Sequence, residues 1–187
     1  MRIISGKFKN KKLCFPKNLK TRPLKDSVRE GIFNILEHSN NIEINIKDSS
    51  IIDLYAGSGS FGFECLSRGS SQTFFVENDG DALINLKKNF KSLNLENQAI
   101  IHSMDVLKFV ENSKIKKKID IVFLDPPYKN KDCMEVIEII KKKDIMNKKH
   151  IIVLHREKGV DNNLKENLNI LENRVYGRSE IFFLKLF

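Results

Sequence analysis

The sequence has no tryptophan, and its 187 residues include only 4 prolines and 3 cysteines. The cysteines (Cys14, Cys65 and Cys133) are odd in number and far apart, which favours reduced thiols over a disulfide framework. The 4 histidines show no metal-ligand spacing relative to the cysteines, so we predict no metal site. No apolar run approaches the roughly 20 residues of a membrane span, and lysines follow the first residues where a signal peptide would be apolar. We therefore expect a cytoplasmic protein with no membrane partner.

The positive charge is concentrated near the start of the chain. The net charge is +9, from 33 Lys and Arg against 24 Asp and Glu. Residues 1–30 hold ten of the basic residues and two of the acidic ones. A localised basic segment is typical of a protein that binds a polyanion, although lysine is abundant along the whole sequence and such runs are commonly solvated surface. The candidate RNA contacts in this segment are Lys7, Lys9, Lys11, Lys12 and Arg22.

The first part of the chain differs in pattern from the rest. Residues 1–15 alternate loosely between apolar and polar, which is typical of a short β-hairpin. Apolar residues then recur at helical spacing over 28–36. The stretch 40–49 is polar and irregular, as expected of a linker. We therefore predict a basic hairpin-and-helix extension over residues 1–40 and a main domain over residues 41–187.

In the main domain, apolar segments alternate with helical ones. Strands are expected at 51–55, 72–76, 99–102, 119–124 and 151–155, with helices between them at 61–68, 81–93, 106–112 and 132–142. This alternation predicts an α/β fold with right-handed crossovers and a mostly parallel sheet covered on both faces. Residues 168–175 and 181–187, on either side of Tyr176-Gly177, predict a closing antiparallel hairpin.

A glycine-rich turn follows the first strand, in the segment Asp53-Leu-Tyr-Ala-Gly-Ser-Gly-Ser-Phe-Gly62. Glycines at this place let the backbone approach a ligand closely at the start of a helix, which makes Gly57 and Gly59 candidate cofactor contacts. The motif alone also fits a nicotinamide or flavin dinucleotide, with Glu77 placed to hold a ribose. A dinucleotide-dependent oxidoreductase therefore stays open on this motif.

Acidic residues mark the ends of the first four predicted strands: Asp53, Glu77, Asp105 and Asp125. The carboxyl ends of parallel strands share one edge of a sheet, so these carboxylates should line one crevice. Carboxylates suit a ligand that offers hydroxyls, an ammonium and a sulfonium better than they suit a pyrophosphate. S-adenosylmethionine is such a ligand. Asp105 taken alone is equally well explained as a helix N-cap.

The most specific motif is Asp125-Pro126-Pro127-Tyr128, which follows the strand predicted at 119–124. Consecutive prolines fix φ and lack N–H donors, so the turn is rigid and its carbonyls are free to accept hydrogen bonds. Asp125 and the carbonyl of Pro126 can accept from an exocyclic amine, and Tyr128 offers a face on which a base stacks. A conjugated amine is a poor nucleophile, so aligning it with an activated methyl group supplies most of the catalysis. These three residues are the candidate catalytic residues.

These motifs resemble those of the bacterial RsmD family, 16S rRNA guanine-N2 methyltransferases within the amino-directed, S-adenosylmethionine-dependent nucleic-acid methyltransferases. The likeness runs almost end to end, through Met1-Arg-Ile-Ile-Ser-Gly-Lys-Phe, Thr21-Arg-Pro-Leu-Lys-Asp-Ser-Val-Arg-Glu, the glycine turn, Leu66-Ser-Arg-Gly, Phe75-Val-Glu and Phe123-Leu-Asp-Pro-Pro-Tyr. The resemblance implies a Rossmann-like class I methyltransferase domain behind a β-hairpin and helix, with S-adenosylmethionine as cofactor. It implies a cofactor site at Asp53, Gly57, Gly59, Glu77 and Asp105, and contact with the reacting amine at Asp125, Pro126 and Tyr128.

The resemblance also implies a substrate, which is one guanine of the small-subunit rRNA. Because a base inside a folded RNA must be exposed to reach Tyr128, we expect an assembled or assembling small ribosomal subunit to present it. We expect the enzyme to be a monomer. Methylation of adenine N6 or cytosine N4 in DNA is the alternative within this chemistry, because the same turn serves it. A non-catalytic RNA-binding factor is the alternative outside it. Two positions depart from the family: Leu24 replaces a threonine that follows Arg-Pro, and Phe61 replaces a small aliphatic residue after the glycine turn.

Overall fold

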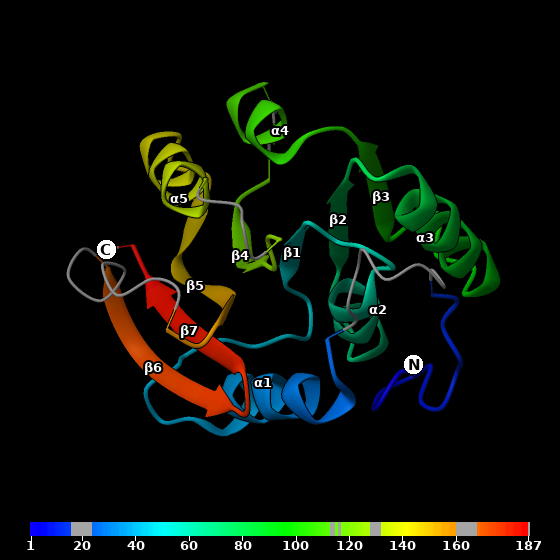
Figure 1. The fold of residues 1–187 in the computed structure, drawn as a ribbon, viewed down its shortest axis with the longest axis horizontal. Helices are drawn as coiled ribbons and strands as arrows, with labels where there is room; N and C mark the ends of the chain where they lie inside the picture. The colour runs from blue at the N-terminus through cyan, green and yellow to red at the C-terminus, as the bar shows by residue number, and fades with distance from the viewer. Residues whose placement is uncertain (16–23, 113–114, 116, 128–131, 160–167, 187) are drawn as a thin grey trace.

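A seven-stranded sheet forms the centre of the computed structural model, with helices on both of its faces (Figure 1). The structure describes residues 1–15, 24–112, 115, 117–127, 132–159 and 168–186. The strands are β1 (Ser50–Leu54), β2 (Gln72–Glu77), β3 (Ala99–Ser103), β4 (Ile119–Leu124), β5 (Met146–Glu157), β6 (Asn169–Tyr176) and β7 (Ser179–Lys185). The helices are α1 (Asp26–His38), α2 (Ser60–Ser67), α3 (Gly80–Ser92), α4 (Val106–Asn112) and α5 (Cys133–Lys142).

The sheet has the order β3-β2-β1-β4-β5-β7-β6. Strands β1 to β5 pair in parallel, and β7 pairs antiparallel with both β5 and β6. The predicted parallel sheet with a closing antiparallel hairpin is therefore confirmed. Most elements begin and end within two residues of their predicted bounds. Strand β5 begins earlier, because Met146 already pairs with Ile119 while the polar residues after Met146 hide this from the sequence pattern.

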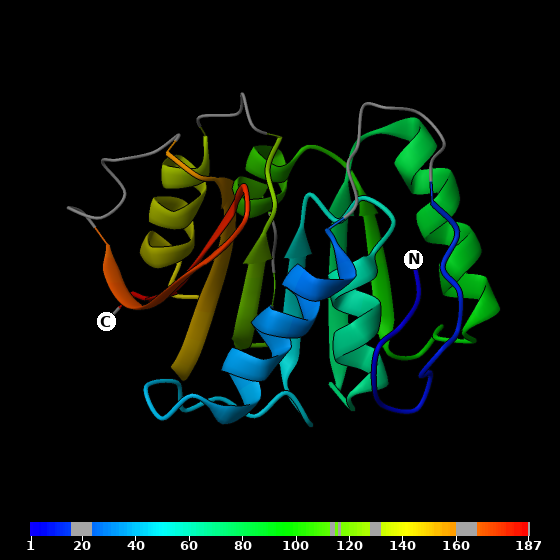
Figure 2. The same cartoon turned by 60° about the horizontal axis from the view of Figure 1, so that its bottom comes forward.

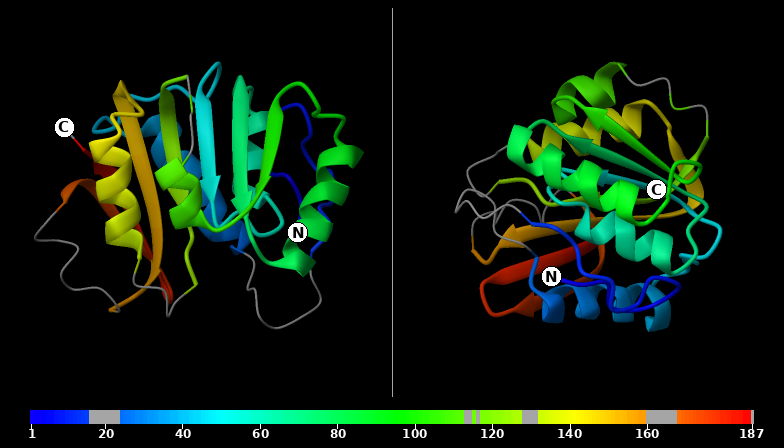
Figure 3. Two further views of the ribbon diagram at one scale, coloured as in Figure 1. Left: turned by 90° about the horizontal axis from the view of Figure 1, so that it is seen from above. Right: turned by 90° about the vertical axis from the view of Figure 1, so that its right-hand side faces the viewer.

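Two helical layers bury the sheet. Helices α4 and α5 cover one face, and α1, α2 and α3 cover the other (Figures 2 and 3). On the second face, the ring of Phe61 stacks between Phe123 at 4.1 Å and Phe33 at 5.2 Å, measured between ring centroids. These rings tie α1 and α2 to β4. Phe61, which departs from the family pattern, is thus a core residue. In the described residues, no helix combines the length and the apolar character needed to cross a membrane.

The stretch predicted to be a linker, 40–49, carries no helix or strand, but it is not a solvated tether. Ile42 and Ile46 are buried in the same apolar cluster as Phe33 and Ile51. Helix α1 and the sheet therefore share one core through this stretch. The division of the chain at residue 40 stays a prediction.

The N-terminal segment, residues 1–15, reverses direction as predicted but does not form two strands. A single antiparallel bridge joins Arg2 and Lys12. The backbone N–H groups of Ile4 and Ser5 instead donate to the Glu64 carboxylate of α2 at 2.7 and 2.9 Å. The expected pairing is therefore short: Ile3 N–H donates to the carbonyl of Lys11 and Leu13 N–H to that of Met1, and docking onto α2 satisfies the donors that follow.

All five parallel strands point the same way, so their carboxyl ends lie along one edge of the sheet, at the top in Figure 2. The glycine turn follows β1 at this edge, and Asp125 follows β4. Glu77 is the last residue of β2, and Asp105 lies two residues after β3. The topology therefore brings to one edge the groups that the sequence placed at strand ends.

Candidate functional site

The glycine turn between β1 and α2 has a left-handed backbone at three positions. Tyr55, Gly57 and Gly59 have φ of 59°, 57° and 81°. A Cβ at Gly59 would stand 2.5 Å from the ring of Phe63, so packing as well as φ requires glycine there. A Cβ at Gly57 would meet nothing within 4 Å. Gly57 therefore borders open space, where a ligand can approach the backbone.

Asp53 lies beneath this turn. Its side chain is 1% exposed, and Oδ2 accepts the N–H of Gly62 at 2.9 Å. Burial raises the pKa of Asp53 well above its usual range. The Gly62 hydrogen bond opposes the rise in pKa, and the charges of Asp125 and Glu77 add to it. Three of the predicted site carboxylates are therefore close enough to interact.

Glu77 holds the glycine turn against the end of β2. Its Oε2 accepts the N–H of Gly57 at 2.7 Å, and its Oε1 accepts the N–H groups of Asn78 and Asp79, both at 2.8 Å. Three backbone donors thus fix the orientation of one carboxylate beside Gly57. A carboxylate held in this way retains lone pairs for the hydroxyls of a ribose.

Asp105 acts as a cap on α4. Its Oδ1 accepts the N–H of Lys108 at 3.1 Å, which is the N-cap geometry that the sequence left open as an alternative. The residue is half-buried. Its second oxygen remains available at the strand-end edge, so capping and cofactor contact are compatible.

Asp125 follows β4 with its carboxylate partly open to solvent, the side chain being 27% exposed. Its Oδ1 lies 2.7 Å from Nδ1 of His155, a residue of β5 whose side chain is 7% exposed. Pro126 is buried and Pro127 is exposed. Tyr128, the third candidate catalytic residue, lies outside the described residues. The structure therefore places one proposed amine acceptor, Asp125, within electrostatic reach of Asp53.

The basic segment divides into exposed and buried cations. Lys7, Lys9, Lys11 and Lys12 are exposed, whereas Arg22 lies outside the described residues. Arg29 contributed to the count of basic residues in 1–30, but its side chain is fully buried. It donates to the carbonyl of Arg2 and to Asp26. Arg29 is therefore a structural cation and not part of a phosphate-binding surface.

Sequence reasoning missed His155 and Asn89. Nδ2 of Asn89 donates to the carbonyls of Cys14 and Ser58, both at 3.0 Å, and thereby joins the N-terminal segment to the glycine turn. No pattern marks a single asparagine in a helix. His155 had a signal, because it ends the strand predicted at 151–155 beside the strand that delivers Asp125. The sequence-based prediction considered only acidic residues at strand ends as site residues, and so it left His155 out.

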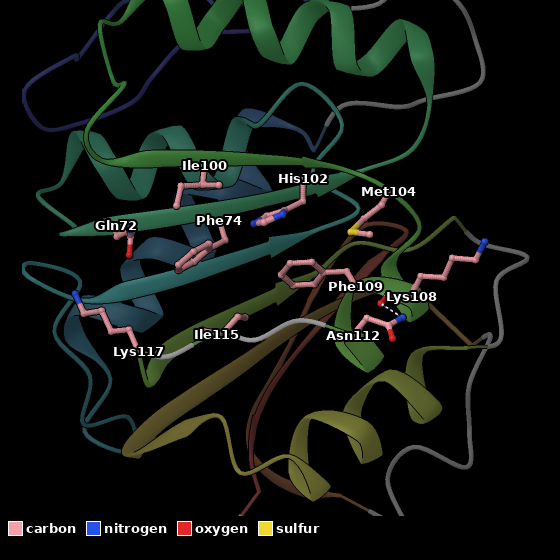
Figure 4. A pocket seen from close by; sticks show the side chains of 10 residues that line it. All are labelled: Gln72, Phe74, Ile100, His102, Met104, Lys108, Phe109, Asn112, Ile115 and Lys117. Carbon is pink, nitrogen blue, oxygen red and sulfur yellow. Dashed lines mark hydrogen bonds between the residues drawn. The ribbon is translucent and has the colours of Figure 1, made fainter.

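A second feature is an apolar pocket of about 450 Å³ on the face of β2 and β3 next to α4 (Figure 4). Phe74, His102 and Phe109 form its floor, and Lys108 and Lys117 stand at its rim. It reaches the strand-end edge at Met104. The glycine turn, Glu77 and Asp125 do not line it, so it is distinct from the acidic site.

The chain is similar to a known protein family, to named relatives and to a solved structure. A family model described as Conserved hypothetical protein 95 matches residues 1–185. A Haemophilus influenzae protein named Ribosomal RNA small subunit methyltransferase D is 31% identical over 178 residues, which cover 95% of this chain and 89% of that protein. The Bacillus subtilis protein named Putative rRNA methyltransferase YlbH is 32% identical over 163 residues, covering 86% and 85%. A solved structure described as a putative methyltransferase, yhhF from Escherichia coli, has a TM-score of 0.80 and 27% identity, covering 98% and 96%.

Proposed function

We propose, from the premise that this chain belongs to the Conserved hypothetical protein 95 family, that it methylates N2 of one guanine in small-subunit rRNA. The chain is an S-adenosylmethionine-dependent rRNA methyltransferase with a Rossmann-like fold. What we propose beyond this is that the enzyme modifies a guanine and that the methyl group goes to its N2 amine.

The observation that carries the proposal is the position of Asp125. Its carboxylate is partly exposed at the strand-end edge, is held by His155, and interacts with Asp53 below the glycine turn. An amine that donates to Asp125 therefore meets the same edge as a ligand at Gly57 and Glu77. This juxtaposition suits transfer between a bound cofactor and an exocyclic amine better than it suits a binding-only role.

The residues at the glycine turn fit S-adenosylmethionine. Gly57 borders open space, and Glu77 is an oriented acceptor beside it, suited to ribose hydroxyls. We propose that Asp53, Gly59 and Asp105 complete this site. The cofactor supplies an electrophilic methyl group on a sulfonium, and the acidic surroundings favour that cation over a pyrophosphate. A site lined by carboxylates is a poor host for the anionic ligand of an oxidoreductase.

The protein's own part in the transfer is alignment. Asp125 and the carbonyl of Pro126 accept hydrogen bonds from the amine and so fix its plane, while Tyr128 stacks on the base. Guanine N2 is a weak nucleophile because its lone pair is delocalised into the ring. Holding it in line with the methyl group is therefore the main source of rate. The proton that the amine loses has an acceptor in Asp125.

We further propose that Lys7, Lys9, Lys11, Lys12 and Arg22 contact RNA phosphates. The four lysines are exposed, and their segment is joined to the glycine turn through Asn89. The target base must be presented outside a stack, so an assembled or assembling small subunit is the proposed substrate. The proposal also takes the enzyme to be a monomer that works in the cytoplasm, where ribosomes assemble.

The experiment is methyl transfer from labelled S-adenosylmethionine to small ribosomal subunits that lack their native methyl marks, followed by nucleoside identification. The proposal expects N2-methylguanosine at one site, and none with Asp125→Ala. Labelled N6-methyladenine or N4-methylcytosine from a parallel DNA reaction, without labelled rRNA, would replace the proposal with the DNA alternative. A different labelled nucleoside in rRNA would keep the enzyme class and overturn the guanine.

A further inference from the structure

His155 and Asp125 stand at the same level of two neighbouring strands. Strands β4 and β5 pair in parallel up to Leu124 and Leu154, so Asp125 and His155 are the next residue of each. Side chains alternate between the two faces along a strand. Both side chains therefore leave the sheet on the face that α1 and α2 cover, and they meet there with Nδ1 2.7 Å from Oδ1.

The hydrogen bond has a defined direction. An ionised carboxylate only accepts, so Nδ1 of His155 carries the proton and donates to Asp125. Nε2 of His155 is buried and has no partner among the described residues. A hydrogen on Nε2 would be a buried, unpaired donor, whereas the Nδ1–H tautomer leaves only a lone pair there. The imidazole therefore acts as a fixed single donor aimed at Asp125.

His155 is itself held firmly. It lies within β5, which pairs with β7 on its other side, where His155 stands opposite Ile181. Asp125, in contrast, has left the β4 ladder and is tied to β1 only by its N–H, 3.4 Å from the carbonyl of Leu54. Of the two partners, the histidine has the better-fixed backbone. We therefore expect His155 to orient the carboxylate of Asp125, and we do not expect Asp125 to orient the imidazole.

We propose that His155 is a positioning residue for methyl transfer, which holds Oδ1 of Asp125 so that Oδ2 faces the target amine. This inference rests on the proposed role of Asp125. The preceding residues of the strand, Ile151 to Leu154, are apolar and fully buried. A histidine with one ring nitrogen unsatisfied is a costly choice at the next buried position, and an apolar residue would serve packing better. The hydrogen bond to Asp125 explains why a histidine stands at this position despite the cost in stability.

Three substitutions separate the two ring nitrogens. His155→Asn retains an N–H donor near the place of Nδ1, His155→Gln moves the amide toward the place of Nε2, and His155→Leu removes both. We expect Leu and Gln to lower kcat roughly 10- to 100-fold, because misplacing a reacting group by about an ångström has effects of this size. Asn should recover kcat to within several-fold of the wild type. The KM for RNA and the Kd for S-adenosylmethionine should change less than about twofold in all three.

His150 provides the matched control, because it is a buried histidine on the same strand, far from the site. Its Nδ1 contacts the carbonyl of Asn147, and its Nε2 accepts the N–H of Leu186. His150→Leu should lower Tm and leave the kcat of the folded protein unchanged. If His155 has only a structural role, its three variants should behave like His150→Leu. Their Tm should fall, and their kcat should not depend on which ring nitrogen has been replaced.

The outcomes distinguish this inference from the proposed function. A His155→Leu enzyme as fast as the wild type, or an Asn variant no faster than the Gln variant, overturns the positioning role. If the wild-type protein methylates DNA instead of rRNA, the proposed function fails, but the ranking of the variants measured on DNA still decides the role of His155. A wild-type protein that methylates neither acceptor overturns both.

Discussion

Two buried carboxylates on the same face of the sheet have opposite surroundings. Glu64 of α2 is fully buried, and its oxygens accept the N–H groups of Ile4 and Ser5 as well as Nε of Arg68 at 2.9 Å. Arg68 in turn binds Glu37 through two contacts of 2.8 Å. The charge of Glu64 is thus compensated by Arg68 in direct contact, by two backbone dipoles and by the nearby charge of Arg29.

Asp53 is buried to the same degree but receives one backbone N–H and lies near two further carboxylates, Asp125 and Glu77. The charges that shift the pKa of Asp53 are those of these two carboxylates, and both raise it. Compensated charge fixes structure, whereas uncompensated like charges destabilise the empty protein and prepare a site for a cation. A buried carboxylate therefore anchors the N-terminal segment where it has partners of opposite charge, as Glu64 does, and forms part of the candidate cofactor site where its neighbours are carboxylates, as Asp53 does.

Of the substitutions that we consider, Asp125→Ala should change activity the most. We expect kcat to fall at least about 100-fold, because the amine loses its oriented acceptor. Removing this carboxylate relieves its repulsion of Asp53 but also leaves the buried Nδ1–H of His155 without an acceptor, so Tm should change less than in Glu64→Leu. Enzyme kinetics and thermal unfolding of the same preparation check both statements. A Tm that falls as far as that of Glu64→Leu would mean that Asp125 serves the fold as Glu64 does, and the contrast between the two carboxylates would be lost.

The second effect is on stability, with Glu64→Leu. Removing this carboxylate strands Arg68 and two backbone donors, so we expect a loss of about 3 kcal/mol in the free energy of unfolding. The kcat of the folded fraction should stay near that of the wild type. Denaturant unfolding measures the loss. Glu37→Gln is the control, since it removes the partly exposed partner of the same arginine and should lose less than about 1 kcal/mol.

Much of the sheet was predictable because β1 to β5 are short apolar runs separated by helical periods. The N-terminal segment was predicted as two paired strands, which do not form. The N–H groups of Ile4 and Ser5 bond to Glu64, on a helix some sixty residues away in the sequence, and the local pattern does not show this. The predicted topology was enough to bring the acidic strand ends to one edge of the sheet. It was not enough to predict that His155 contacts Asp125, because this contact depends on the exact register of β4 against β5.

The third effect is a change in pH dependence, with Asp53→Asn. Because the folded pKa of Asp53 is raised, the native protein keeps this proton at pH values where the unfolded chain, with an ordinary pKa near 3.8, has lost it. The stability that Asp53 contributes therefore declines as pH rises from that value toward the raised pKa. Asparagine keeps an oxygen for the Gly62 N–H and does not ionise. The Tm of the variant, relative to that of the wild type, should rise as pH increases above the ordinary pKa of an aspartate, whereas a constant difference would place a cation near Asp53 and end the contrast with Glu64.

The smallest effect concerns the lysines of the anchored segment. Lys9, Lys11 and Lys12 are exposed, while Lys7 also packs its ammonium 5.4 Å from the centroid of the Phe8 ring, so we leave Lys7 unchanged. Replacing the three with glutamine should keep stability within about 0.5 kcal/mol. If they contact phosphates, the slope of log affinity for RNA against log salt should become shallower by about two, since each contact to a single strand adds about 0.7. The same replacement at the exposed Lys141, Lys142 and Lys148 should leave the slope unchanged. Equal slopes in both triple variants would show that the N-terminal segment, which Glu64 anchors to the fold, has no role in RNA binding.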